Sequence, residues 1–154
     1  MTDSNGHAEF IGDGWTATPY PLVIAGRNNS VFLLDKPNAG HHVLGEVYRV
    51  DEAKLSRLDE LEGHPDYYAR RLERISLADG ATVATEQPHL QAWTYFLMDF
   101  RLELLEKPFL TESQDSAEQP YVPVERRDPA QAVDARLDVL NHYPAKRRPS
   151  RSSE

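Results

Sequence analysis

The segment from Val50 to Arg70 constrains the fold most, because it contains a helix with both ends marked. Asp51 can cap the helix, since its carboxylate can accept hydrogen bonds from the free N–H groups of the first turn. Gly63 fits the left-handed residue that commonly ends a helix, and Pro65 prevents the helix from resuming. Leucines at three-residue spacing predict one apolar stripe along it: Leu55, Leu58 and Leu61. The segment therefore predicts a short helix followed by a sharp turn.

Glu62 breaks two local rules in this helix. It follows Leu55 by seven residues, so it projects on the apolar side of the stripe. It also lies in the last turn, where the negative end of the helix dipole disfavours another negative charge. An acid in such a position is a candidate general base with a raised pKa. The alternative is an ordinary carboxylate at a frayed helix end that turns out to solvent, and the pattern alone leaves both open.

Length and composition narrow the class of protein. A chain of 154 residues predicts one domain with a modest core. Its net charge of −8 argues against nucleic-acid binding. The absence of cysteine excludes disulfides, thiolate nucleophiles and zinc–thiolate sites, and it suits a reducing cytosol. The polar start lacks the pattern of a signal peptide, and no apolar run reaches the roughly 20 residues that cross a bilayer. We expect a cytoplasmic monomer without nucleic-acid or membrane partners.

Short strands, separated by turn residues, flank the helix on both sides. The predicted strands are residues 7–16, 22–24, 31–34, 42–50, 70–77 and 90–98. Glycines at positions 12 and 14 predict a bulge or a close backbone approach in the first strand. Residues 78–88 predict a hairpin connection, and residues 101–106 a short helix. The pattern predicts an α+β fold, as a small mixed β-barrel or a curved sheet, with one main helix packed on it.

The character of the sequence changes at Asp128. We therefore assign residues 1–127 to the domain and residues 128–154 to a short helix followed by a basic tail. The spacing of Val133, Leu137 and Leu140 favours a helix. The basic, Ser/Pro-rich stretch from Lys146 to the end is typical of disorder.

The residues around Glu62 carry a resemblance to a known family. Leu58-Asp59-Glu60-Leu61-Glu62, followed by Pro65, Tyr68 and Arg70, resembles the signature of the γ-glutamylamine cyclotransferase family, part of the wider γ-glutamyl cyclotransferase-like (AIG2-like) group. Three earlier segments are similar to this family in the same order: Pro19–Gly26, Phe32–Leu34 and Gly45–Asp51. The resemblance covers about residues 6–125. It implies a compact α+β barrel with a cavity at one end. It also implies that this sequence starts after the family's first strand and Tyr-Gly-Thr-Leu turn, whose amides hold a substrate carboxylate.

The resemblance implies an activity as well. The family converts γ-glutamylamines such as ε-(γ-glutamyl)lysine to 5-oxoproline and a free amine, with the residue matching Glu62 as general acid/base and with no metal or organic cofactor. Candidate residues to line the pocket and contact the substrate are Leu22, Tyr48, Tyr68, Tyr95 and Tyr121. Two other functions stay open: a cyclotransferase for γ-glutamyl amino acids, and a non-catalytic binding or interaction protein that keeps the fold.

The histidines and serines give little support to other chemistry. His41 and His42 are adjacent, so on a strand they point to opposite faces and cannot chelate one ion together. The other four histidines show no ligand spacing, and no nucleophile elbow is present. We therefore expect neither a metal site nor a Ser/His/Asp hydrolase.

Overall fold

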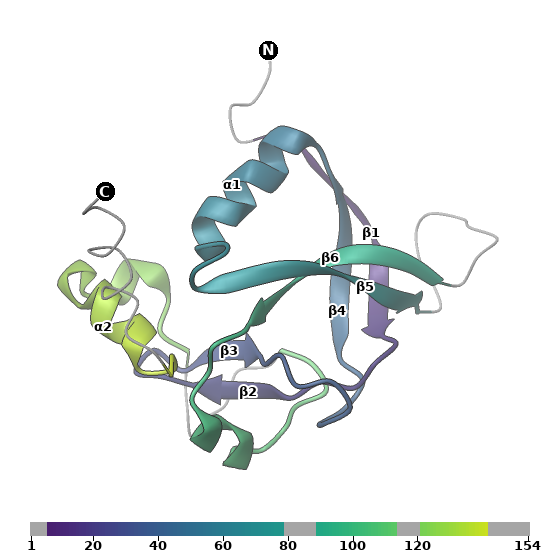
Figure 1. Ribbon diagram of the computed structural model, residues 1–154. Coiled ribbons are helices and arrows are strands. Elements are labelled where there is room, and N and C mark those ends of the chain that lie inside the picture. Colours follow the sequence, from purple (N-terminus) through teal and green to yellow (C-terminus); the bar gives the residue numbers. More distant parts are fainter. Residues whose placement is uncertain (1–5, 79–88, 114–120, 142–154) are drawn as a thin grey trace, which may run out of the picture.

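The computed structural model describes residues 6–78, 89–113 and 121–141, and Figure 1 shows the arrangement of their helices and strands. The strands are β1 (Ala8–Thr16), β2 (Leu22–Ala25), β3 (Ser30–Leu33), β4 (Leu44–Val50), β5 (Tyr68–Leu77) and β6 (His89–Leu97). The α-helices are α1 (Glu52–Glu62) and α2 (Ala132–Leu137). Short 3-10 helices are η1 (Leu102–Glu106), η2 (Val124–Arg126) and η3 (Pro129–Gln131).

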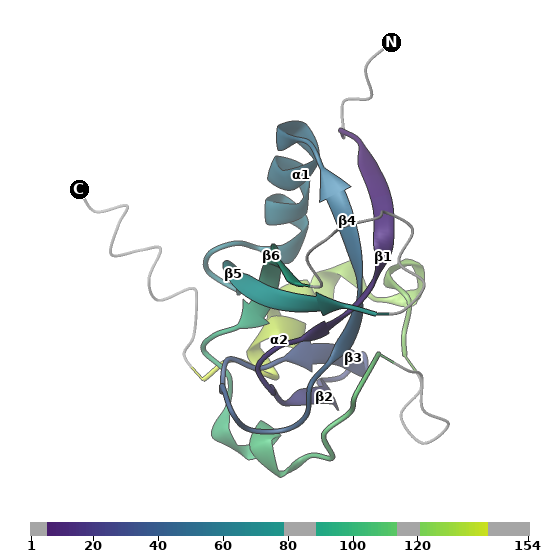
Figure 2. The same cartoon turned by 90° about the vertical axis from the view of Figure 1, so that its right-hand side faces the viewer.

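The strands form two antiparallel sheets. The larger has the order β4-β1-β5-β6, and the smaller pairs β2 with β3. A single parallel bridge between Leu34 and Leu97 joins the smaller sheet to the end of β6. Figure 2 shows the larger sheet curving beside α1, with β2 and β3 on the other side of the molecule. The α+β prediction, in its curved-sheet form with one main helix, is confirmed.

Two glycines bend β1. The register with β4 shifts between Phe10 and Gly12, which is the expected bulge. At Gly14 a Cβ atom would lie only 2.5 Å from the Cγ2 of Ile75 on β5. Because only a residue without a side chain fits there, β1 can cross close to β5 and the sheet can curve. Both predictions for these glycines are confirmed.

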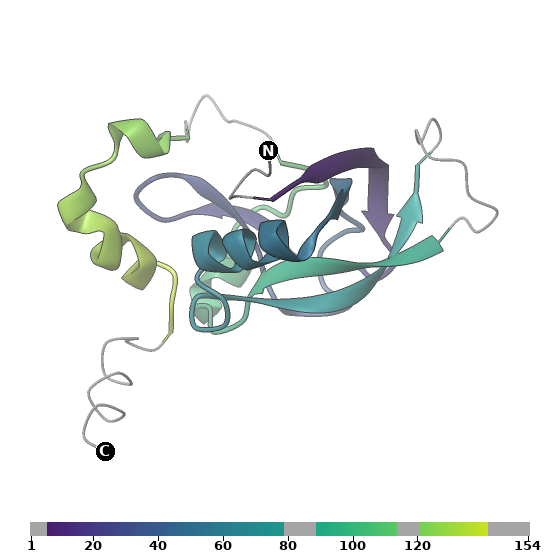
Figure 3. The same cartoon turned by 90° about the horizontal axis from the view of Figure 1, so that it is seen from above.

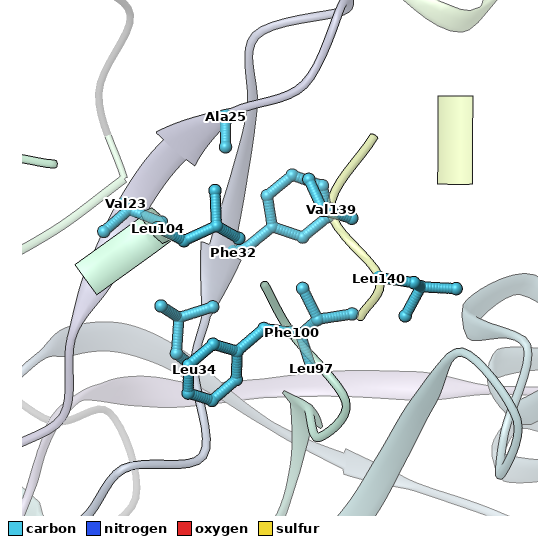
Figure 4. Close-up of a cluster of buried hydrophobic side chains, with 9 residues drawn as sticks. All are labelled: Val23, Ala25, Phe32, Leu34, Leu97, Phe100, Leu104, Val139 and Leu140. Carbon is cyan, nitrogen blue, oxygen red and sulfur yellow. The ribbon is translucent and has the colours of Figure 1, made fainter. Parts of the chain in front are cut away.

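The main hydrophobic core lies between the small sheet, the end of β6 and the C-terminal segment. Its buried members are Val23, Ala25, Phe32, Leu34, Leu97, Phe100, Leu104, Val139 and Leu140 (Figure 4). The last two follow α2, so the chain returns to the core after that helix. Backbone hydrogen bonds hold it there, from Arg101 N to Val139 O and from Asn141 N to Asp99 O, both at 2.8 Å. This packing fixes α2 beside β2 and β3.

α1 begins and ends where the sequence predicts. Asp51 accepts a hydrogen bond from Lys54 N at 2.8 Å, and Gly63 has the left-handed φ of 68°. Leu55 and Leu58 are half-buried as expected, but Leu61 is 58% exposed, so the predicted apolar stripe is wrong at its last member. The reason is that the last turn of α1 faces a cavity rather than the sheet.

Some of the predicted segments lie outside the described residues. Most of the predicted connection 78–88, and the whole tail from Lys146, lie outside them. The helix predicted near residues 130–140 is present as η3 followed by α2, and the one predicted at 101–106 is η1. Among the described residues, none of the helices is long and apolar enough to span a membrane.

Candidate active site

Glu62 is the last residue of α1, and it lines a cavity of about 480 Å³. The cavity is bounded by the end of α1, by the turn between β2 and β3, and by the segment from Tyr121 to Arg136. Seen from above in Figure 3, α1 and the C-terminal helices lie at the same end of the molecule. The cap at Gly63 stops the helix at this point, so the Glu62 side chain is held at the cavity wall.

Burial controls the charge of Glu62. Its side chain is half-buried, and this loss of water raises the pKa of the Glu62 carboxyl, while the nearby Arg136 guanidinium works in the opposite direction. A carboxyl group with a raised pKa can accept a proton in one step and return it in the next. The position of Glu62 therefore suits a general acid/base.

Two adjacent tyrosines stand beside Glu62. The ring centroids of Tyr67 and Tyr68 are 4.8 Å apart, and Tyr68 stacks on Phe32 at 6.0 Å. Burial raises the pKa of Tyr67 to about 12, and it also raises the pKa of Tyr68. Both phenols therefore keep their protons at neutral pH and can donate hydrogen bonds into the cavity.

Asp59, one turn before Glu62, fixes α1 to the sheet. Its two carboxylate oxygens accept hydrogen bonds from the Arg70 guanidinium at 2.8 and 3.2 Å, and Oδ1 also accepts one from the Tyr95 hydroxyl at 2.6 Å. The Arg70 guanidinium in turn covers the Trp93 ring, with Cζ 4.2 Å from the centroid. These hydrogen bonds, from Arg70 first and then from Tyr95, lower the pKa of the Asp59 carboxyl. Asp59 therefore stays ionised and holds the helix in place.

The structure brings together only part of the predicted site. Glu62, Tyr68 and Tyr121 line the cavity. Leu22, Tyr48 and Tyr95 do not line it, so the prediction that they line the pocket around Glu62 is corrected. Leu22 is only 6% exposed, enclosed within the fold. Tyr48 lies on exposed β4, where its hydroxyl donates to Glu46 at 2.7 Å, and Tyr95 is directed at Asp59.

Among the cavity residues that sequence reasoning missed are Tyr67 and Arg136. Tyr67 precedes β5 and belongs to a turn, in which its N–H donates to the Gly63 carbonyl at 2.8 Å. That turn brings Tyr67 and Tyr68 to one cavity, whereas adjacent strand residues would point to opposite faces. Arg136 reaches the cavity from α2, and its Cζ lies 4.5 Å from the Tyr67 ring centroid. No local pattern could have revealed this contact, because it depends on how the C-terminal segment packs.

Metal ligands do not cluster in the described residues. Within residues 6–78, 89–113 and 121–141, no three His, Asp or Glu side chains are grouped to hold an ion. The groups that line the cavity offer proton transfer by Glu62, hydrogen bonds from tyrosines and positive charge from arginines.

Comparison with known proteins identifies the family. A family model for "Gamma-glutamyl cyclotransferase, AIG2-like" matches residues 2–121. The chain belongs to the γ-glutamyl cyclotransferase, AIG2-like family. The match confirms the resemblance, and it ends before η3 and α2, which supply much of one wall of the cavity.

Individual proteins and a solved structure are also similar to this chain. A gamma-glutamylaminecyclotransferase of Bos taurus is 39% identical over 129 residues, which cover 82% of this chain and 73% of that protein. The Troponin C-akin-1 protein of Drosophila melanogaster is 35% identical over 126 residues, which cover 82% and 72%. Among solved structures, an AIG2-like protein from Mus musculus is similar with a TM-score of 0.72 at 33% identity, covering 80% of this chain and 83% of that one.

Proposed function

We propose that this protein is a γ-glutamylamine cyclotransferase that converts substrates such as the ε-(γ-glutamyl)lysine isopeptide to 5-oxoproline and a free amine. The observation that carries the proposal is the position of Glu62, a half-buried carboxyl group with a raised pKa at the wall of a cavity. Family membership and the named relatives support the reaction class.

In the proposed reaction the α-amine of the γ-glutamyl group attacks its own γ-carbonyl carbon. The new C–N bond closes a five-membered ring, and the amide bond from that carbon to the nitrogen of the leaving amine breaks. The attacking ammonium loses two protons and the leaving nitrogen gains two, so the reaction needs proton transfer but no redox change. Glu62 accepts one proton from the ammonium and delivers it to the leaving nitrogen. The second proton lost by the ring nitrogen and the second gained by the released amine are exchanged with water.

Positioning supplies the rest of the rate enhancement. An open-chain γ-glutamyl group must fold so that its amine faces its carbonyl, and a cavity that holds it so can contribute roughly 7–11 kcal/mol. The hydroxyls of Tyr67 and Tyr68 are protonated donors that can orient the substrate amide. This chemistry requires no cofactor. We propose that the protein carries it out as a cytoplasmic monomer acting on small molecules.

The test is release of 5-oxoproline from ε-(γ-glutamyl)lysine by three proteins. The wild type should be active, and Glu62→Gln should lose about 10²–10⁴-fold in turnover because the amide cannot shuttle the proton. Glu60→Gln is the matched control, since Glu60 is an exposed acid on the same helix whose side chain is 72% accessible. Full activity in Glu62→Gln would overturn the assignment of this residue.

A substrate panel separates the two cyclotransferase functions. The proposal predicts faster turnover of ε-(γ-glutamyl)lysine than of γ-glutamylalanine, whose leaving group is an α-amino acid. The reverse order would favour a cyclotransferase for γ-glutamyl amino acids. No 5-oxoproline from either substrate would reject both and favour a binding protein.

A further inference from the structure

Three arginines line the cavity of Glu62, and they differ in what they already contact. Arg27 donates from Nε at 2.8 Å and from Nη2 at 2.9 Å to the Asp138 carboxylate. Arg127 donates to the Val122 carbonyl at 2.8 Å. These contacts use both arginines to fasten the C-terminal segment.

Arg136, on α2, has no such partner. Its guanidinium lies over the face of the Tyr67 ring, with Cζ 4.5 Å from the centroid, so the N–H donors at the edge of its plane stay available. Within the part of the chain that the structure describes, its side chain makes no hydrogen bond and no ion pair with a carboxylate. An exposed guanidinium at a cavity wall can therefore take an anionic group of a ligand.

Arg136 stands near the general acid/base but not against it. A Cβ atom placed on Gly63, the residue after Glu62, would lie 3.0 Å from Arg136 Nη1. Burial raises the pKa of the Glu62 carboxyl and the charge of Arg136 opposes this rise, yet the two groups form no ion pair. Arg136 is also held in place, because Val139 and Leu140, which follow α2, are buried in the core. The cavity thus holds a fixed positive group a short distance from the carboxyl group that is proposed to move protons.

The proposed reaction determines where the leaving amine lies. Glu62 passes a proton from the attacking amine to the leaving nitrogen, so both nitrogens lie beside it and the rest of the leaving amine extends away through the cavity. In ε-(γ-glutamyl)lysine that remainder is a chain of four methylenes that ends in an amino acid group with a carboxylate. Such a flexible chain lets the carboxylate reach a guanidinium that is near Glu62 without touching it. The guanidinium can then hold the carboxylate through two parallel hydrogen bonds.

The position of Arg136 in the sequence favours the leaving amine over the glutamyl group. All γ-glutamyl substrates share the glutamyl group, so its recognition is expected within the region that the family shares, residues 2–121. Arg136 lies beyond that region, on a segment that supplies a wall of the cavity. Leaving amines differ between substrates, and a side chain outside the shared region suits their selection.

We infer that Arg136 binds a carboxylate carried by the leaving amine and so selects the class of amine that the enzyme releases. The inference rests on the proposed function for the identity of the ligand. Amines with a carboxylate at the far end, such as lysine joined through its ε-nitrogen, are preferred. Diamines and polyamines, which end in a positive charge, are disfavoured because the guanidinium repels them.

Binding tests this role with two ligands that differ only in charge at the far end. They are the γ-glutamyl amides of 6-aminohexanoic acid and of 6-aminohexanamide, which share an unchanged glutamyl group. The parent protein carries Glu62→Gln to prevent turnover, and calorimetry gives the dissociation constants. In this parent, the 6-aminohexanamide compound should bind about 10-fold more weakly than the acid, the cost of a charge-assisted hydrogen bond.

Variants at position 136 locate the source of that difference. Adding Arg136→Gln should abolish it, so that the two ligands bind equally. Arg136→Lys should restore part of it, because an ammonium supplies the charge without the bidentate geometry. Arg126→Gln is the matched control and should keep the full difference, since Arg126 is an exposed arginine of η2 that does not line the cavity.

The outcomes separate this inference from the proposed function. A difference that persists in Arg136→Gln, or that disappears equally in Arg126→Gln, would overturn the role of Arg136, as would a parent that binds neither ligand or binds both equally. If the wild type then still releases 5-oxoproline from both compounds, the proposed function stands without this inference. An Arg136-dependent difference in a protein whose wild type releases no 5-oxoproline would support the carboxylate site and reject the proposed activity. Thermal melting of each variant would confirm that it is folded.

Discussion

Two hollows flank α1, and they differ in what lines them. One of about 350 Å³ runs along the side of the helix and is lined mostly by apolar groups, including those of Leu55, Leu58 and Ile75. The other, at the end of the helix, contains Glu62, tyrosines and arginines. The helix is held along its side, and it presents Glu62 to a polar cavity at its end. In the proposed function, fixation and chemistry therefore occupy different parts of the same helix.

Asp59 and Glu62, which lie one turn apart on α1, differ in the same way. Asp59 accepts hydrogen bonds from Arg70 and Tyr95, and its pKa is lowered. Glu62 makes no hydrogen bond through its carboxylate to a described residue, and burial raises its pKa. Opposite pKa shifts on neighbouring acids are the expected mark of one structural and one reactive group.

The largest expected effect comes from moving the Glu62 carboxylate. Glu62→Asp keeps the charge but withdraws the carboxylate by one methylene, and a displacement of this size can cost about a hundredfold in turnover. The measurement is the rate of 5-oxoproline release at saturating ε-(γ-glutamyl)lysine. Turnover near that of the wild type would show that the position of this group is unimportant, which a general acid/base does not allow.

Removing the anchor at Asp59 should affect both stability and activity. Asp59→Asn leaves the Arg70 guanidinium without a carboxylate, which should cost about 1 kcal/mol of unfolding free energy in this partly solvated pair. Because Glu62 then sits on a less fixed helix, we expect turnover to fall about tenfold. Urea unfolding and the 5-oxoproline assay measure the two effects.

Glu60→Gln is the control for the anchor. It breaks a solvent-exposed ion pair between Arg57 and Glu60 on the same helix, 3.2 Å long, and should change neither quantity measurably. If Asp59→Asn behaved like Glu60→Gln, the contacts to Arg70 and Tyr95 would be incidental rather than an anchor.

The local features of α1 were predictable from sequence because each is encoded within a few residues. Asp51 and Gly63 mark its ends through their own backbone and side-chain chemistry, and the structure places both as predicted. Glu62 could be singled out because it conflicts with its neighbours and because it matches a family signature. The bulge at Gly12 and the close approach at Gly14 were predictable for a similar reason.

Features that depend on distant packing could not be predicted in this way. Period-two alternation shows that Tyr48 and Tyr95 share a face with other strand residues, but it does not say which hollow that face borders. Leu61 follows the apolar spacing, yet it lines the cavity at the end of α1 and stays exposed. Arg136 enters the site only because Val139 and Leu140 anchor the end of the chain in the core.

A smaller effect should distinguish tyrosines of the two regions. Tyr67→Phe removes a protonated hydroxyl beside Glu62 and should lower kcat/KM about 3- to 10-fold, the cost of one hydrogen bond. Tyr48 lines the hollow along the side of α1 instead, so Tyr48→Phe should leave kcat/KM unchanged. Alkaline absorbance titration of Tyr67→Phe should also lose a tyrosine that ionises at about pH 12 in the wild type. Equal effects of the two substitutions would reject the placement of substrate in the Glu62 cavity.

The smallest effect concerns how stability depends on pH. Because the folded protein raises the pKa of Glu62, it holds more protons at this site than the unfolded chain does between the ordinary and the raised pKa. Stability contributed by Glu62 therefore falls as the pH rises through that window, and Glu62→Gln should melt on the order of 1–3 °C above the wild type near neutral pH. The difference should vanish below about pH 4, where Glu62 is protonated in both states.

The pH dependence at Asp59 has the opposite sign. The lowered pKa of Asp59 adds stability that is lost as the pH falls, so Asp59→Asn should approach the wild type in acid. Melting temperatures of the three proteins across this pH range test both signs, and a Glu62→Gln variant that melts below the wild type at neutral pH would mean that attraction to Arg136 outweighs the cost of burial.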